Sequence, residues 1–141
     1  MRPGAALLGA LLLAGCSGLR TGPVRRPDPY PDRTTATAAW HTFLWAYTSG
    51  DVPVLGEVSA WNEARELKEA LVQRGPEGTA AWCREAAADL AVIDAEWTTQ
   101  GEELAYLRAV VSSRQTARTE WKVALLRRPD GWAVSDRRLV R

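Results

Sequence analysis

The chain has 141 residues, of which 18 are lysine or arginine and 17 are aspartate or glutamate, for a formal net charge of +1 at pH 7. Neither sign of charge dominates, which argues against a nucleic-acid partner. A single histidine excludes a multi-histidine metal site, and no phosphate-binding glycine loop, serine elbow, paired-cysteine motif or calcium loop occurs. We therefore expect neither a metal nor a cofactor.

The amino terminus predicts export and lipid attachment. Arg2 precedes an apolar run over residues 5–14, which is shorter than the roughly 20 residues that span a bilayer. A basic start, a short apolar run and small residues at its end are typical of a secretory signal peptide. The residues Leu13-Ala14-Gly15-Cys16 resemble the lipobox of bacterial lipoproteins. The resemblance implies a signal peptide over residues 1–15 and a lipidated Cys16.

This lipobox implies a bacterial envelope protein that is attached to a membrane by the lipid on Cys16. The alternative is an ordinary signal peptide with an incidental cysteine. Ser17 favours the outer membrane, facing the periplasm, if the cell is Gram-negative, because aspartate at that position of lipoproteins favours inner-membrane retention. Cys83 is then the one remaining cysteine, and its alanine-rich surroundings predict a buried, inert thiol.

Residues 16–33 read as a tether. Four prolines, at positions 23, 27, 29 and 31, exclude a helix because proline lacks an amide donor and restricts the residue before it. At about 3.1 Å per residue in extended polyproline geometry, residues 18–33 predict a spacer roughly 50 Å long. Three of its arginines, Arg20, Arg25 and Arg26, could touch anionic lipid or cell-wall polymer, and a merely soluble linker is the alternative.

A single domain is expected over residues 34–141, and helices come first. An aromatic stripe at helical spacing predicts a helix from Thr34 or Thr35 that ends at Ser49-Gly50. A turn or single helical turn follows over residues 51–55. Ser59 is placed to cap a second helix that Gly75 ends. Pro76 then suits the first position of a third helix, which covers about residues 77–89.

Four strands are expected after residue 90, where the apolar pattern changes to a period of two. They cover residues 91–98, 104–113, 120–126 and 132–136, and Pro129-Asp130-Gly131 is a strong turn signal between the last two. Short connections predict antiparallel neighbours. The expected fold class is α+β, with the helices packed on one face of a curved four-stranded meander. Alternation also predicts that Asp136 shares a face with Trp132 and Val134.

Two stretches, AAWHTFLWAYTSGD and EWKVALLRRPDGWAVSD, together with this element order, resemble the nuclear-transport-factor-2-like (NTF2-like, cone or SnoaL-like) superfamily. The resemblance implies helices and a curved sheet that enclose a pocket. One departure is that no extra short strand can be placed between the helices. The superfamily includes isomerases, dehydratases, ligand binders and assembly modules, so the fold does not select a function.

We favour a non-catalytic domain that binds a partner protein or a small apolar ligand. Trp45, Trp61, Trp82 and Trp97 are the candidate contacts, because tryptophan suits half-buried sites that offer its N–H a partner. Core packing is the alternative role for each of the four.

A pocket enzyme of the isomerase or dehydratase kind is the alternative function. Its candidate acid–base groups are Asp94, Asp136 and His41, since an acid buried beside tryptophan has a raised pKa. Simpler roles exist for all three. Asp94 lies two residues from Glu96, a spacing that also fits the solvent-exposed face of a strand. Asp136 could pair with an arginine, and His41 could have a structural role. We favour the non-catalytic function because these groups do not form a convergent set.

Overall fold

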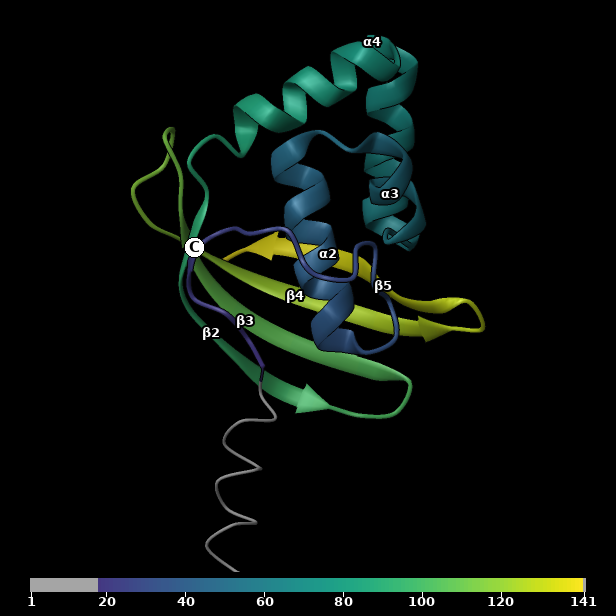
Figure 1. Ribbon diagram of the computed structural model, residues 1–141, viewed down its shortest axis with the longest axis vertical. Helices are drawn as coiled ribbons and strands as arrows, with labels where there is room; N and C mark the ends of the chain where they lie inside the picture. Colours follow the sequence, from purple (N-terminus) through teal and green to yellow (C-terminus); the bar gives the residue numbers. More distant parts are fainter. Residues whose placement is uncertain (1–17, 141) are drawn as a thin grey trace, which may run out of the picture.

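The computed structural model describes residues 18–140. Residues 1–17 and 141, which include the expected signal peptide and Cys16, lie outside the described residues. Figure 1 shows helices on one face of a curved antiparallel sheet, so the expected α+β class is confirmed. None of the helices between residues 18 and 140 is long and apolar enough to cross a membrane.

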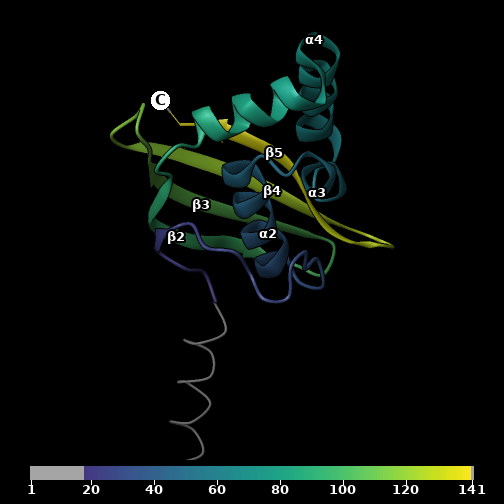
Figure 2. The same ribbon diagram turned by 45° about the horizontal axis from the view of Figure 1, so that its top comes forward.

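The first helix, α2 (Ala36–Ser49), has the ends that the sequence predicts. The Thr35 side chain accepts a hydrogen bond from the Ala38 N–H, and Gly50 ends the helix in the left-handed conformation at φ 71°. A short α3 (Val52–Glu57) follows, with Asp51 as its N-cap. α2 lies across the inner side of the sheet (Figure 2).

The third helical element, α4 (Trp61–Ala86), contains both of the later helices that the sequence predicts. Its halves meet at Gly75, whose φ of 73° and ψ of 174° are not helical, and Pro76 begins the second half as expected. The predicted cap at Ser59 is wrong. Ala60 is the N-cap and makes no side-chain hydrogen bond, while Ser59 forms a parallel bridge with Val134.

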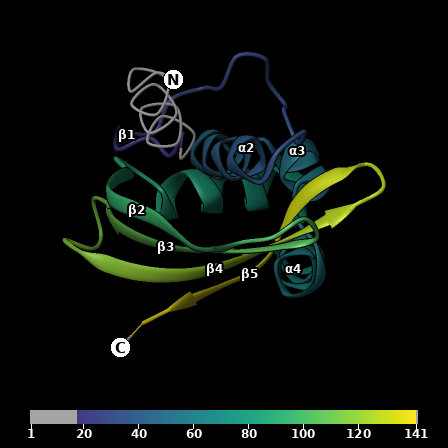
Figure 3. The same ribbon diagram turned by 90° about the horizontal axis from the view of Figure 1, so that it is seen from below.

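Within residues 18–140 the sheet has five strands rather than the four expected, in the order β1-β2-β3-β4-β5, and every neighbouring pair is antiparallel. The strands are β1 (Gly22–Pro23), β2 (Ala91–Gln100), β3 (Leu104–Ser112), β4 (Thr119–Arg128) and β5 (Gly131–Leu139). The additional strand, β1, comes from the expected tether. Figure 3 shows the curvature of the sheet around the helices.

Residues 18–33 lie along the domain, so the expected extended spacer is wrong for this part of the chain. β1 pairs with β2, and Leu19 and Val24 pack against the core. Further along, the Asp32 N–H donates to Thr42 Oγ1 at 3.0 Å, and the Tyr30 hydroxyl donates to Asp51 Oδ2 at 2.7 Å. The prolines exclude a helix, as expected, but they do not keep the segment away from the domain.

A β-bulge changes which side chains of β5 face the helices. Leu125 pairs with Val134, whereas the preceding Ala124 pairs with Asp136, so Ser135 is the extra residue. The predicted common face of Val134 and Asp136 is therefore wrong. Asp136 lies on the outer face of the sheet, and Arg137, opposite Val123, lies on the inner face.

The core lies between α2 and the inner face of the sheet. Trp40 and Phe43 of α2 are fully buried together with Val123 and Leu125 of β4, and the rings of Trp40 and Trp121 meet edge to face at 6.3 Å. Burying each such side chain contributes about 1.5–3 kcal/mol. Cys83 is also fully buried, as predicted for an inert thiol.

Candidate functional site

A cationic side chain lies inside the domain. Arg137 is surrounded by three aromatic rings, and its guanidinium carbon is 4.7 Å from the ring centre of Trp121, 4.8 Å from Tyr47 and 5.3 Å from Phe43. These distances are within the range of cation–π attraction, which contributes about 2 kcal/mol or more when the pair is shielded from water. The rings come from α2 and β4, so the site links the two main layers of the fold.

Glu63 compensates the charge of Arg137. Arg137 Nε donates to Glu63 Oε1 at 2.8 Å, and the two side chains are only 17% and 7% exposed. Burial alone would lower the pKa of Arg137, but Glu63 and Tyr47 outweigh it, and the pKa is raised above its usual value. Arg137 is therefore a permanent cation with a fixed counter-ion.

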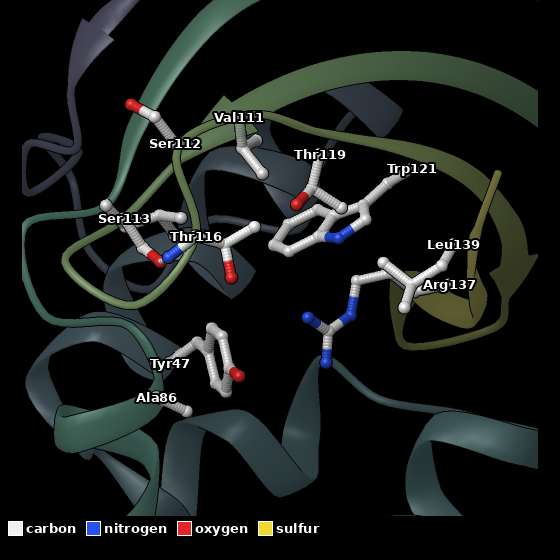
Figure 4. A pocket seen from close by; sticks show the side chains of 11 residues that line it. Tyr47, Ala86, Val111, Ser112, Ser113, Thr116, Thr119, Trp121, Arg137 and Leu139 are labelled. Carbon is white, nitrogen blue, oxygen red and sulfur yellow. Dashed lines mark hydrogen bonds between the residues drawn. The ribbon is translucent and has the colours of Figure 1, made fainter. Parts of the chain in front are cut away.

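A cavity of about 390 Å³ opens beside Arg137 at the end of the sheet where β3 turns into β4. Figure 4 shows the guanidinium between Trp121 and Tyr47, with the Tyr47 hydroxyl directed towards it. The lining combines apolar side chains with hydroxyl groups; its members are Tyr47, Ala86, Leu90, Val111, Ser112, Ser113, Thr116, Thr119, Trp121, Arg137 and Leu139.

This lining favours binding over chemistry. The aromatic and aliphatic walls suit an apolar body, and the guanidinium and hydroxyls can donate hydrogen bonds to an acceptor group. Glu63 lies behind Arg137 and is held by the ion pair, which is not the arrangement of a free general base. A carboxylate that gives up its ion pair in order to accept a proton would leave a buried, unpaired guanidinium.

A second, much smaller cavity of about 30 Å³ adjoins the first, because Tyr47 and Arg137 line both. Cys83 and Trp82 belong to its wall. Burial raises the pKa of the Cys83 thiol, which disfavours the thiolate that nucleophilic chemistry needs. Cys83 therefore has the properties of a packing residue.

Asp94 lies on the outer face of the sheet, away from the cavity. Arg108 contacts it at 2.6 Å between Nη2 and Oδ2, and the same guanidinium contacts Glu96 at 3.0 Å and Glu120 at 3.4 Å. This cluster bridges three strands on the solvent side. This placement agrees with the alternative that Asp94 and Glu96 lie on the solvent-exposed face of a strand.

Asp136 and His41 lie apart from Asp94 and from each other. Asp136 Oδ2 contacts Arg138 Nε at 2.5 Å, and Asp136 Oδ1 accepts from Asn62 at 3.3 Å. His41 on α2 accepts from the Arg20 N–H at 3.3 Å, and burial, with a smaller effect from Arg20, lowers the pKa of His41 to about 4. The three candidate acid–base groups do not share a cavity.

The four candidate tryptophans divide into two pairs. Trp61 is 75% exposed and Trp82 is 40% exposed, both on α4, and Arg74 lies 5.0 Å above the Trp82 ring. Trp97 packs against the core, and its Nε1 has no hydrogen-bond partner among the described residues. Trp45 is half-buried on α2. None of the four lines the cavity of about 390 Å³.

The central residue, Arg137, was not expected at the site. Strict alternation along β5 directs Asp136 to the inner face, and only the bulge at Ser135 brings Arg137 there instead. A bulge leaves little trace in the apolar pattern. The one signal in the sequence is that an arginine, Arg137, directly follows Asp136, the position predicted to face inward. Tyr47 falls within the predicted first helix and Trp121 within the predicted third strand, where each has the pattern of a packing residue, so neither stands out in the sequence as a site residue.

Among residues 18–140, no group of three or more histidine, cysteine, aspartate or glutamate side chains could hold a metal ion. The lining that the described residues give the cavity of about 390 Å³ includes no carboxylate. Glu63 and Glu66 line the adjoining small cavity, and Glu63 is already bound to Arg137. The arrangement offers hydrogen-bond donors rather than metal ligands.

No protein-family model matches the chain, and a comparison with curated proteins found no match. Among solved structures, a Campylobacter jejuni protein named as an NTF2-like transpeptidase is similar, with a TM-score of 0.43 and 20% identity. The similarity covers 67% of this chain and 91% of that chain. At this TM-score it does not decide the family. The observed element order, helices followed by an antiparallel sheet, is consistent with an NTF2-like fold.

Proposed function

We propose that this chain is a lipid-anchored bacterial envelope protein whose NTF2-like domain binds a small apolar ligand without catalysis. The ligand occupies the cavity beside Arg137. The observation that carries this proposal is a buried, charge-compensated guanidinium on the wall of a cavity of about 390 Å³. Cavities of roughly 300–1,000 Å³ with apolar walls and a few polar groups are typical of small-molecule sites.

The lining defines the class of ligand. Leu90, Val111 and Trp121 offer apolar contact, while Arg137 and the hydroxyls of Thr116 and Thr119 offer donors. The ligand is therefore a small molecule with an apolar body and one hydrogen-bond acceptor. Because Glu63 already neutralises Arg137, the acceptor need not be an anion, and a carbonyl suits the site as well as a carboxylate.

Two probes test this proposal by calorimetric titration. Octanoate and its methyl ester share an apolar chain and an acceptor group but differ in charge. We expect saturable binding of at least one. Thr116→Trp should block the cavity and abolish binding, whereas Arg118→Trp, in the same loop but outside the lining, should not. The absence of saturable binding for both probes would contradict a ligand of this class.

A partner protein is the second candidate, and one observation favours it. α4 presents Trp61 and Val72 at 75% and 83% exposure, eleven positions apart, which places them on the same side of a helix. Trp61→Ser with Val72→Ser should leave the melting temperature nearly unchanged. If α4 is a docking surface, the pair should also remove any envelope protein that co-purifies with the detergent-extracted wild type.

A further inference from the structure

The folded domain begins very close to the proposed lipid. Leu19 packs against the core, and the Arg20 N–H donates to His41 Nε2 at 3.3 Å. Gly22 then pairs with Val92, and the Val24 N–H donates to the Leu90 carbonyl at 3.3 Å. From position 19 onward the chain is therefore attached to the domain.

Covalent geometry limits the separation between anchor and domain. Only residue 17 lies between Cys16 and Gly18. A fully extended chain spans at most about 3.6 Å per residue, so the α-carbons of Cys16 and Gly18 are no more than about 7 Å apart. A lipid on Cys16 inserts in the bilayer, and the domain surface around Gly18 must then lie at the headgroups.

The strand order identifies that surface. β1 and β2 form one edge of the sheet, and β5, packed on α4, forms the opposite edge (Figure 3). Because β1 runs antiparallel to β2, the chain leaves Gly22 towards Gly18 in the direction of the β2–β3 hairpin at residues 101–103. The surface of the domain around the β1–β2 edge therefore lies closest to Cys16.

Charge on the N-terminal segment of this edge is complementary to anionic lipid, whereas the β2–β3 hairpin carries Glu102 and Glu103. Residues 18–27 contain no acidic side chain, and Arg20, Arg25 and Arg26 are all exposed. Arginines close to an anionic membrane surface are attracted to it, and the attraction falls off within a Debye length.

We propose that the β1–β2 edge, with Arg20, Arg25 and Arg26, rests on the anionic headgroups of the anchoring bilayer, with the β2–β3 hairpin near the membrane surface and α4 on the far side. This orientation rests on the lipid attachment of Cys16 proposed above. It leaves Trp61 and Val72 of α4 facing the aqueous space, where a partner protein can reach them.

Single-cysteine labels test the orientation in the full lipoprotein. Cys83 is 1% exposed and the lipid blocks Cys16, so a thiol dye labels Glu102→Cys or Gln73→Cys selectively. The labelled proteins are reconstituted in phosphatidylglycerol–phosphatidylethanolamine vesicles that contain a headgroup nitroxide lipid. We expect quenching at position 102 to be several-fold stronger than at position 73. Equal or reversed quenching would overturn the orientation.

A linker variant tests whether the short connection between Cys16 and Gly18 causes the proposed orientation. A flexible glycine–serine insertion of about 15 residues between Ser17 and Gly18 adds roughly 20 Å of root-mean-square reach. In uncharged phosphatidylcholine vesicles it should abolish the contrast between positions 102 and 73. The same insertion between Ala117 and Arg118 should preserve the contrast. A contrast that persists with the first insertion would refute the tether argument.

Mass spectrometry of the same samples separates the two proposals. If the purified protein carries no diacylglyceryl group on Cys16, both the anchor and the orientation are wrong. If the group is present and positions 102 and 73 are quenched equally, the anchor is supported and the orientation alone is overturned.

Discussion

The buried ion pair between Arg137 and Glu63 gives the sharpest test of the site. Glu63→Gln removes the compensating charge with almost no change in shape and leaves a guanidinium of 17% exposure without its counter-ion. Breaking a buried pair from one side typically costs about 3–5 kcal/mol. Because the glutamine oxygen can still accept the Arg137 Nε–H, and three aromatic rings remain around the cation, we expect a loss near 3 kcal/mol.

The double variant Glu63→Leu/Arg137→Met separates charge from packing. Replacing both partners by apolar groups of similar size is often neutral or stabilising, so this variant should recover most of the stability that Glu63→Gln loses. Urea unfolding followed by tryptophan fluorescence measures each free energy of unfolding. A loss below about 1 kcal/mol in Glu63→Gln, together with no recovery in the double variant, would show that the pair is effectively solvated. The double variant should also bind octanoate more weakly, because it lacks the guanidinium donors.

Three further outcomes are expected. Burial lowers the pKa of His41 to about 4, below the ordinary 6.5, so the unfolded chain takes up a proton first as the pH falls. Because His41 is partly exposed and solvent screens its charge, about 1–2 kcal/mol of stability should be lost between pH 6.5 and 4, and His41→Gln should flatten that loss in urea titrations. Gly50→Ala places a Cβ 2.7 Å from the Ala80 carbonyl at φ 71° and should cost roughly 2 kcal/mol in thermal unfolding, whereas Gly56→Ala, with no atom closer than 3.9 Å, should be neutral or stabilising. Cys16→Ser should move the protein from the membrane to the soluble fraction, and unchanged membrane retention would exclude the lipobox.

The helices could be predicted because their ends carry local chemistry. Thr35 and Gly50 satisfy backbone groups of α2 within a few residues, so the sequence window contains the cause of the boundary. Ser59 shows the limit of this reasoning. It has the right side chain for a cap, but the bridge to Val134, seventy-five positions away in sequence, fixes its backbone instead. No local pattern contains that contact.

The N-terminal segment shows the same limit at a larger scale. Its prolines correctly exclude a helix, yet an extended backbone is also what a strand at a sheet edge requires. The choice between a free spacer and an added strand depends on the surface available to Leu19 and Val24, which forms only when β2 and α2 are packed together. Composition alone therefore predicts the extended backbone of this segment correctly, but it does not predict that the segment packs against the domain.

One inserted residue in β5 decides the chemistry of the inner face. Without the bulge at Ser135, Asp136 would lie opposite Val123, and a carboxylate would face the core near Glu63. Two buried acids without a cation would raise each other's pKa, which is the arrangement of a proton-transfer site. With the bulge, Arg137 takes that position, pairs with Glu63 and cancels its charge. The same few residues could therefore have formed an acid–base pocket, and the register of a single strand pair instead gives the pocket a charge-compensated wall that is rich in hydrogen-bond donors.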